Sequence, residues 1–153
     1  METQETITGD IRPEIVATPL DALTEFYYAF NHRDMGAMSA NWQDSPEIAM
    51  SNPLGGIRRG WAEIRGVYER IFNGTAQVYV EYHDYTLLQN GDMFCAVGRE
   101  RGWFRKGGEE VPLAIRTSRI FMRHDGRWRQ VHHHGSIDDP ALLDRYQKAV
   151  QTK

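Results

Sequence analysis

Apolar side chains recur at helical spacing in the first half of the chain. This pattern predicts helices over 18–32, 34–42 and 61–72, with a short strand over 47–52. Thr18 is a candidate N-cap for the first helix, and Pro19 suits its first turn. Asn73 and Gly74 are expected to end the third helix.

After Gly74 the apolar period changes to two, which is typical of β-strands. Strands are expected at about 76–89, 93–106, 110–124 and 127–137, followed by a helix over 138–150. Their connections contain the hairpin sequences Asn90-Gly91-Asp92, Gly107-Gly108 and Asp125-Gly126. Such long strands are expected to be strongly twisted and to contain bulges. The order predicts an α+β chain with a flexible N-terminal segment over 1–17 and a single domain over 18–153.

The composition is typical of a globular chain, with 41% hydrophobic and 25% charged residues and a formal net charge of −3. This charge argues against a nucleic-acid partner. No apolar run approaches the ~20 residues that span a bilayer, so no membrane partner is expected. The polar N-terminus lacks the features of a signal peptide, and Cys95 has no second cysteine to pair with. The sequence therefore predicts a soluble, cytoplasmic protein.

Arginine makes up fifteen of the eighteen basic residues, and its planar guanidinium suits bidentate contact with carboxylates. Arg99 and Arg119 lie among apolar neighbours on strands joined by one hairpin. Both are therefore expected to converge over the sheet face that the helices cover. A buried guanidinium needs an acceptor, which is either an internal acid such as Glu63 or Glu100 or a ligand anion. The remaining alternative is that one or both arginines point to solvent.

Three consecutive histidines in the last predicted strand raise the question of a metal site. His132 and His134 would project to the same side of the strand, about 6.5–7 Å apart. No third ligand can be identified from the spacing, because no zinc-binding motif accompanies them. The sequence therefore predicts no metal and no cofactor.

The predicted helices carry a set of aromatic side chains, namely Phe26, Tyr27, Tyr28, Phe30, Trp42, Trp61 and Tyr68. Aromatic residues at helical spacing usually pack in a core, although they also line ligand cavities. Tyr27, Trp61 and Tyr68 are the candidates for lining a cavity.

Four motifs lie between Leu20 and Ser136. They are Asn31-His32-Arg33-Asp34-Met35, Ser51-Asn52-Pro53-Leu54-Gly55, Gly60 with Ile64, and the closing strand from Asp125 to Ser136. In these motifs the chain resembles the nuclear-transport-factor-two-like superfamily, which includes SnoaL-like polyketide cyclases and ketosteroid isomerase. The closing strand is similar to that of the calcium/calmodulin-dependent kinase II association domain. The resemblance implies a cone-shaped, cystatin-like fold, with N-terminal helices packed on a strongly curved, mixed, mostly antiparallel sheet.

The similarity to the kinase association domain also implies positions for pocket residues. Arg99 and Arg119 match two of its three pocket arginines, whereas Gly135 occupies the third position. Val131 and His133 would face the pocket as well. The outer sheet surface, which often forms the dimer contact in relatives, would then carry Trp128, His132, His134 and Ser136. A homodimer through this surface is expected.

The resemblance to ketosteroid isomerase fails at the general base. Asn52 stands where that enzyme has an aspartate before a Pro-x-Gly turn, and an amide cannot take up a proton near neutral pH. The position of its oxyanion-hole tyrosine holds Phe26, with Tyr27 adjacent. Steroid isomerisation is therefore disfavoured.

Together these patterns favour a small-molecule-binding homodimer with an arginine-anchored pocket for a small, carboxylate-bearing ligand. The candidate ligand-binding residues are Arg99, Arg119, Asn52, Tyr27, Trp61, Tyr68 and His133. One alternative is a SnoaL-like enzyme that performs proton transfer on a small apolar substrate, as an isomerase, cyclase or hydrolase. Its acid/base set would be His133 with Tyr27 or Tyr68. Another is an association-only dimerisation module, since this fold supports many functions.

Overall fold

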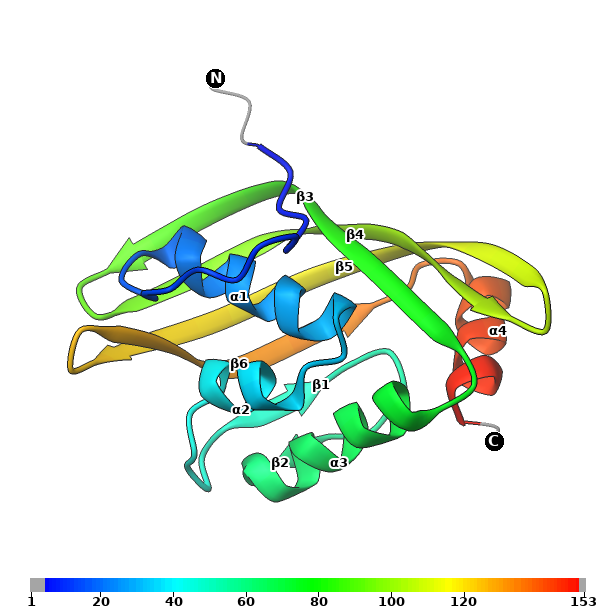
Figure 1. Ribbon diagram of the computed structural model, residues 1–153, viewed down its shortest axis with the longest axis horizontal. Helices are drawn as coiled ribbons and strands as arrows, with labels where there is room; N and C mark the ends of the chain where they lie inside the picture. Colours follow the sequence, from blue (N-terminus) through cyan, green and yellow to red (C-terminus); the bar gives the residue numbers. More distant parts are fainter. Residues whose placement is uncertain (1–4, 152–153) are drawn as a thin grey trace.

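Six strands form one open, curved sheet in the structure, a computed structural model that describes residues 5–151 (Figure 1). They are β1 (Ala49–Ser51), β2 (Arg58–Arg59), β3 (Gln77–Asn90), β4 (Met93–Lys106), β5 (Glu109–His124) and β6 (Arg127–Ser136). The strand order is β2-β1-β6-β5-β4-β3, in which β1 and β6 are parallel and the other neighbours are antiparallel. The expected α+β class with a mixed, mostly antiparallel sheet is confirmed.

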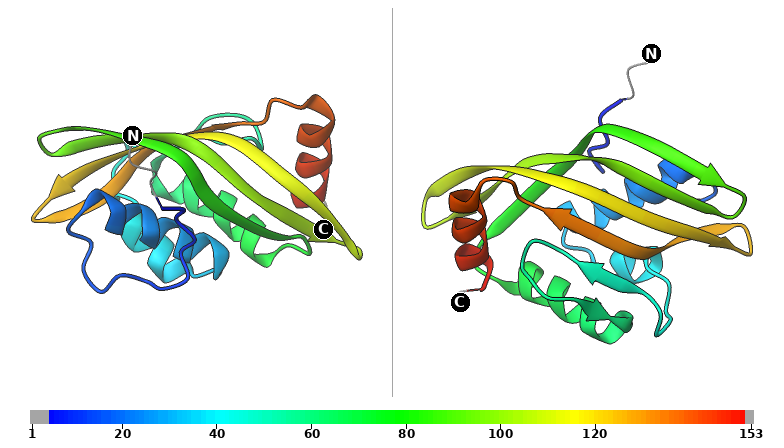
Figure 2. Two further views of the ribbon diagram at one scale, coloured as in Figure 1. Left: turned by 90° about the horizontal axis from the view of Figure 1, so that it is seen from above. Right: turned by 180° about the vertical axis from the view of Figure 1, so that it is seen from behind.

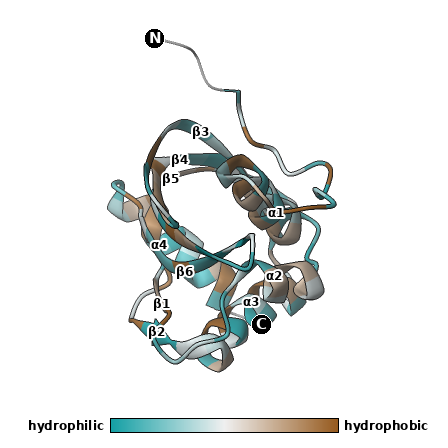
Figure 3. Cartoon of the chain, turned by 90° about the vertical axis from the view of Figure 1, so that its left-hand side faces the viewer, coloured by the Kyte–Doolittle hydropathy of each residue, from teal (hydrophilic) through white to brown (hydrophobic). Residues whose placement is uncertain are grey.

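Three helices lie on one face of the sheet, which curves around them (Figure 2; Figure 3). They are α1 (Pro19–Asn31), α2 (Met35–Asn41) and α3 (Gly60–Asn73), and a fourth, α4 (Pro140–Gln151), lies where β4 turns into β5. The start of α1 is fixed by a capping box, because the Thr18 hydroxyl accepts from the Asp21 N–H and the Asp21 carboxylate accepts from the Thr18 N–H. The expected N-cap is thus confirmed.

A β-bulge at Val131 changes which side chains of β6 face the helices. Gln130 and His132 pair with consecutive residues of β5, so Val131 is the extra residue between them. Strict alternation would put Trp128 and His133 on opposite faces, yet Trp128 is 0% exposed and His133 is 5% exposed. The expectation that Trp128 lies on the outer surface is therefore wrong, because the bulge reverses the alternation.

The N-terminal segment contacts the rest of the domain from residue 5 onward. Ile7 and Tyr82 exchange two backbone hydrogen bonds, at 3.0 and 2.9 Å. Val16 is buried, and the Trp128 indole donates to the Ala17 carbonyl at 3.1 Å. Residues 5–17, the described part of the expected flexible segment, therefore contact the domain at Ile7, Val16 and Ala17, while Ile11 and Ile15 are exposed.

The expected helices and long strands are all present, with small differences at their ends. The two-residue strand β2 is absent from the expectation, because so short a segment has no periodicity to detect. Within residues 5–151, no helix combines the length and the apolar character that crossing a membrane requires.

Candidate functional site

Arg119 lies on the inner face of β5, enclosed by side chains and 2% exposed. Its Nη2 donates to Glu100 at 2.9 Å and its Nη1 donates to Gln130 at 2.8 Å. The guanidinium carbon also lies 3.5 Å from the centre of the Phe26 ring. The buried charge therefore has a carboxylate, an amide oxygen and an aromatic face around it.

The partner of Arg119 is one of the internal acids considered from the sequence, Glu100. Its Oε2 also accepts a hydrogen bond of 2.6 Å from the Tyr27 hydroxyl. Burial and the nearby Glu100 raise the pKa of Tyr27 well above its usual value, so the phenol keeps its proton and donates. The positive charge is thus balanced within the protein, without a ligand anion.

Arg99 does not join Arg119, and this expectation is wrong. In the register of β4 and β5, Arg119 is opposite Ala96, whose side chain is also buried. Because Ala96 and Arg99 are an odd number of residues apart, their side chains lie on opposite faces of the strand. The Arg99 side chain is 52% exposed on the outer face and pairs with Asp84 at 3.2 Å.

A small hollow lies beside Arg119 between the sheet and the helices. Its volume is about 30 Å³, enough for about one or two water molecules. Its lining is largely apolar, and the polar groups at its wall come from Asn52, Tyr68, Glu100, Arg119, His133 and Tyr146. The hollow therefore combines apolar side chains with a few convergent hydrogen-bonding groups.

Tyr68 brings a free hydrogen-bond donor to this hollow from α3. Its side chain is 2% exposed, and its hydroxyl makes no hydrogen bond of good geometry with the residues the structure describes. Burial raises the pKa of Tyr68 to about 12 in spite of the opposing effect of Arg119. The phenol is therefore a protonated donor at neutral pH.

His133 presents a ring nitrogen to the same hollow from β6. Its Nδ1 lies 3.3 Å from the Ser118 carbonyl, which can only accept, so Nδ1 carries the hydrogen. Burial, and then the charge of Arg119, hold the pKa of His133 well below its usual value. The ring is therefore neutral, and its Nε2 has a lone pair with no partner among residues 5–151.

Gly135 provides the space that the His133 ring occupies. A Cβ at this position would lie 3.2 Å from Cε1 of His133 and 3.1 Å from Cδ of Pro53. A side chain at this position would therefore press on the imidazole and on Pro53.

Lowering the pH is expected to destabilise the protein through His133. Because its pKa is lower in the folded state than the ~6.5 of an unfolded chain, the unfolded state takes up the proton first. Stability then falls as the pH falls below ~6.5, by up to about 2 kcal/mol at pH 5 from this group alone. Urea unfolding between pH 5 and 7 measures this effect.

The matched variants for that experiment are His133→Gln and His134→Gln. His134 is exposed on the outer face one residue away. We expect His133→Gln to have a smaller loss of stability at low pH than the wild-type protein, and His134→Gln to behave like the wild type. Equal slopes in all three proteins would show that His133 is not the titrating group.

The structure brings together four of the seven candidate binding residues at the hollow, namely Asn52, Tyr68, Arg119 and His133. Tyr27 is buried beside Arg119, and its hydroxyl donates to Glu100. Trp61 is only partly buried and packs against the core. Gln130 and Tyr146 are functional neighbours that sequence reasoning missed. Gln130 carries no distinctive motif, and the sequence does not indicate where the closing helix with Tyr146 packs.

The histidine run does not form a metal site. His132 lies 3.0 Å from the Ala49 carbonyl through its Nδ1, and His134 is exposed. Within residues 5–151, no three His, Cys, Asp or Glu side chains converge on one point.

The side chain of Asn52 forms a hydrogen bond within its own turn, since its Oδ1 accepts from the Leu54 N–H at 3.2 Å.

The chain is similar in sequence to a curated plant protein. Over 127 residues the chain is 27% identical to the F-box protein SKIP8 of Arabidopsis thaliana, covering 83% of the chain and 51% of that protein. The chain thus spans about half the length of this curated relative.

Solved structures with the same fold include a putative calcium/calmodulin-dependent protein kinase type II association domain from Thiobacillus denitrificans. It superimposes with a TM-score of 0.67 at 25% identity, covering 83% of this chain and 100% of that one. A ketosteroid isomerase-like protein from Erwinia carotovora atroseptica has a TM-score of 0.69 at 21% identity, covering 78% and 92%. The expected cystatin-like class is confirmed as well. The model of the SnoaL-like domain matches residues 20–140, and the chain therefore belongs to the SnoaL-like domain family.

Proposed function

We propose that this protein binds a small, uncharged molecule in the hollow beside Arg119. The observation that carries this proposal is a free donor and a free acceptor in one hollow, the Tyr68 hydroxyl and Nε2 of His133, next to an ion pair that is already balanced. A carboxylate would add a second negative charge beside Glu100, so the anionic ligand expected from the sequence is not retained. An amide or a hydroxyketone has the complementary groups.

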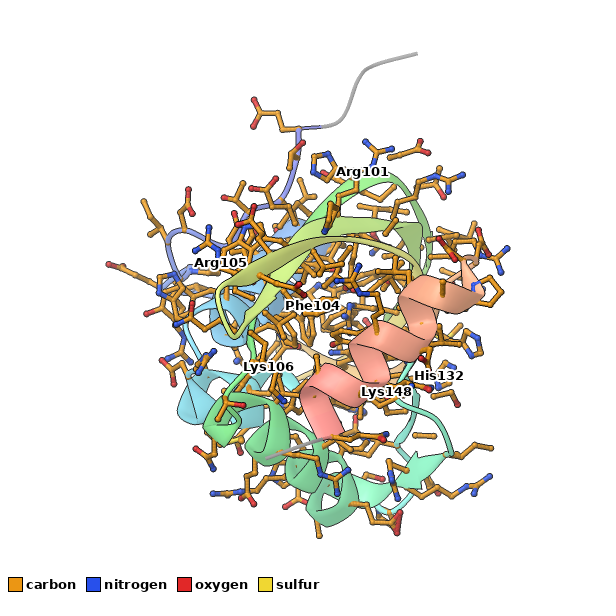
Figure 4. The ribbon with its side chains drawn as sticks, turned by 90° about the vertical axis from the view of Figure 1, so that its right-hand side faces the viewer. Arg101, Phe104, Arg105, Lys106, His132 and Lys148 are labelled. Atoms are coloured by element: carbon orange, nitrogen blue, oxygen red, sulfur yellow. The ribbon has the colours of Figure 1, made fainter. Side chains whose placement is uncertain are left out.

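Helix α4 covers this hollow and limits its size. Tyr146 is 4% exposed, lines the hollow and packs on Phe104, with ring centres 5.8 Å apart. Figure 4 shows α4 in front of the sheet end that carries Phe104, with Lys106 beside it. Polar contacts hold the helix at its edges, such as that from Gln147 to the Pro53 carbonyl at 2.9 Å. A ligand larger than water therefore requires α4 to shift.

Removing the Tyr146 ring is expected to open the hollow and strengthen binding. Benzamide is a suitable probe, because its carbonyl can accept from Tyr68 and its amide can donate to His133. We expect Tyr146→Ala to bind benzamide at least about tenfold more tightly than the wild-type protein, because the ligand no longer has to displace α4 to enter the hollow. Chemical-shift changes in amide NMR spectra during titration measure both affinities.

Leu143→Ala is the matched control, since Leu143 lies on the same helix and packs against the core without lining the hollow. It should loosen α4 packing without creating space beside Tyr68. Shifts that cluster around Tyr68 and His133 support the proposal. Benzamide binding that is equal in both variants, or that maps elsewhere, contradicts it.

Proton transfer is the second candidate function. It is favoured by one observation, that the Tyr68 hydroxyl and Nε2 of His133 share the hollow. Tyr27 is less suited, because its hydroxyl already donates to Glu100. The lowered pKa of His133 makes it a weak base, so simple binding ranks first. Failure of the protein to speed the exchange of the α-protons of cyclohexanone in D₂O would exclude this candidate.

We also propose that the protein is a homodimer through the outer sheet face. Trp128, which the sequence places on that face, is fully buried on the inner side. The apolar side chains on the outer face are instead those of Leu88 and Val97, which are 75% and 50% exposed. An exposed apolar surface of this kind favours self-association.

Light scattering tests this proposal and the association-only alternative. We expect the mass of a dimer for the wild-type protein and that of a monomer for Val97→Arg, because a charge at the centre of an apolar interface is costly to bury. Val97→Ile is the control that keeps the surface apolar. A monomeric wild type would contradict the dimer, and a larger ring would favour association as the main function.

A further inference from the structure

Glu25 of α1 is a buried carboxylate that holds two arginines in place. It is 1% exposed. Arg127 donates to both of its oxygens, at 2.8 and 3.0 Å, and Arg12 donates to Oε2 at 3.3 Å. Asn41 donates to Oε1 at 3.1 Å. With four hydrogen bonds from three donor groups, this carboxylate has no capacity for a further cation.

The two arginines keep most of their own donors free. Arg127 makes all its hydrogen bonds, including one of 3.0 Å to the Ala40 carbonyl, through Nη2. Arg12 likewise uses only Nη2. The remaining guanidinium N–H groups of both residues make no hydrogen bonds with the described part of the chain. Glu25 therefore orients two guanidinium groups without saturating them.

A third arginine, Arg129, completes the group. Its guanidinium makes no ion pair or hydrogen bond with residues 5–151, and the side chain lines the same surface hollow as those of Arg12 and Arg127. This hollow has a volume of about 560 Å³. It lies at the end of the molecule where the N-terminal segment meets the start of β6 (Figure 1). Its wall carries three arginines against two acids, Glu25 and Glu14, so positive charge is in excess.

Guanidinium forks that are fixed by a buried carboxylate are pre-organised donors for oxyanions. A phosphomonoester offers three terminal oxygens and close to two negative charges, which match several forks better than a single carboxylate does. We propose that the hollow formed by Arg12, Arg127 and Arg129 is a binding site for the phosphate group of a phosphomonoester. This site is separate from the hollow beside Arg119 and does not depend on the function proposed there.

Titration with glycerol 3-phosphate at low salt tests the site, with amide NMR shifts as the readout. Arg129→Gln is the decisive variant, because Arg129 takes no part in the contacts that hold Glu25. We expect saturable shifts around residues 12–14 and 127–129, a Kd at least about fivefold higher in Arg129→Gln, and weaker binding as salt is added. Arg65→Gln, on the exposed face of α3, is the matched control and should bind like the wild type.

Two further arms identify the source of the phosphate. The first arm is sedimentation with vesicles of phosphatidylcholine containing phosphatidic acid, compared with vesicles of phosphatidylcholine alone. It tests whether the same site binds a lipid headgroup. Retention that is lost in Arg129→Gln would assign the site to a membrane lipid, and binding of glycerol 3-phosphate without retention would assign it to a soluble metabolite. Absence of saturable binding in both arms, or equal losses in Arg129→Gln and Arg65→Gln, overturns the proposal.

Discussion

Glu100→Ala is expected to lower the free energy of unfolding by about 3–5 kcal/mol. The substitution leaves the Arg119 guanidinium buried without its carboxylate, and it removes the acceptor of the Tyr27 hydroxyl. Both groups are almost completely shielded from water, so the solvent cannot replace what is lost. Urea unfolding followed by circular dichroism measures the change.

Glu110→Ala is a close control for this experiment. Glu110 also pairs with an arginine across β4 and β5, at 2.7 Å from Arg105, but its side chain is 53% exposed. An exposed pair contributes at most about 1 kcal/mol, because water and salt screen it. A larger loss of unfolding free energy in Glu100→Ala than in Glu110→Ala would therefore show that burial of the ion pair causes the difference.

The double variant Glu100→Leu/Arg119→Met provides the second check. Apolar side chains in place of both charges leave no uncompensated ion, so this protein should be more stable than either single variant. If Glu100→Ala costs no more than Glu110→Ala, the buried pair does not balance Arg119 in the folded protein. The assignment of the hollow to uncharged ligands would then lose its basis.

Much of the fold follows from local patterns in the sequence. The capping sequence at Thr18, the hairpin turns and the change of apolar period after Gly74 each depend on neighbouring residues. The β-bulge at Val131 could not be placed in this way. It is set by the pairing of β5 with β6, and one extra residue moves every later side chain to the other face.

The candidate site was harder to predict, because it depends on which face each strand presents. One hollow is lined by His133, Arg119, Asn52 and Tyr68, since each comes from a separate element or loop packed around one core. Arg99 was assigned to the wrong face, because the register of the β4–β5 hairpin was not known. From the sequence, Glu100 is only one of several possible partners of Arg119, beside Glu63, another internal acid and a ligand anion. No pattern in a single sequence distinguishes these acids before the pairing of strands is fixed.

Selectivity between a neutral and an anionic ligand is the second large effect that we expect. Benzamide and benzoate have the same shape and differ in charge. Beside the Glu100–Arg119 pair, benzoate would lose its hydration and meet a carboxylate whose charge already balances the arginine. We therefore expect the wild-type protein to prefer benzamide by at least about tenfold.

Glu100→Gln should shift this preference toward benzoate. The glutamine keeps the shape and an oxygen acceptor, but it leaves the Arg119 charge without a counterion. An anionic ligand can then supply the missing negative charge, and the ratio of the two dissociation constants should shift toward benzoate by about tenfold or more. Well-dispersed amide spectra of the variant would confirm that it is folded.

The ratio of the benzoate and benzamide dissociation constants, measured by NMR titration of the wild-type protein and of Glu100→Gln, is the most direct test. We predict a ratio well above one for the wild type and a much lower ratio for the variant. A wild-type protein that binds benzoate more tightly than benzamide, with shifts around Arg119, would show that the arginine is available to an anion and would contradict the account.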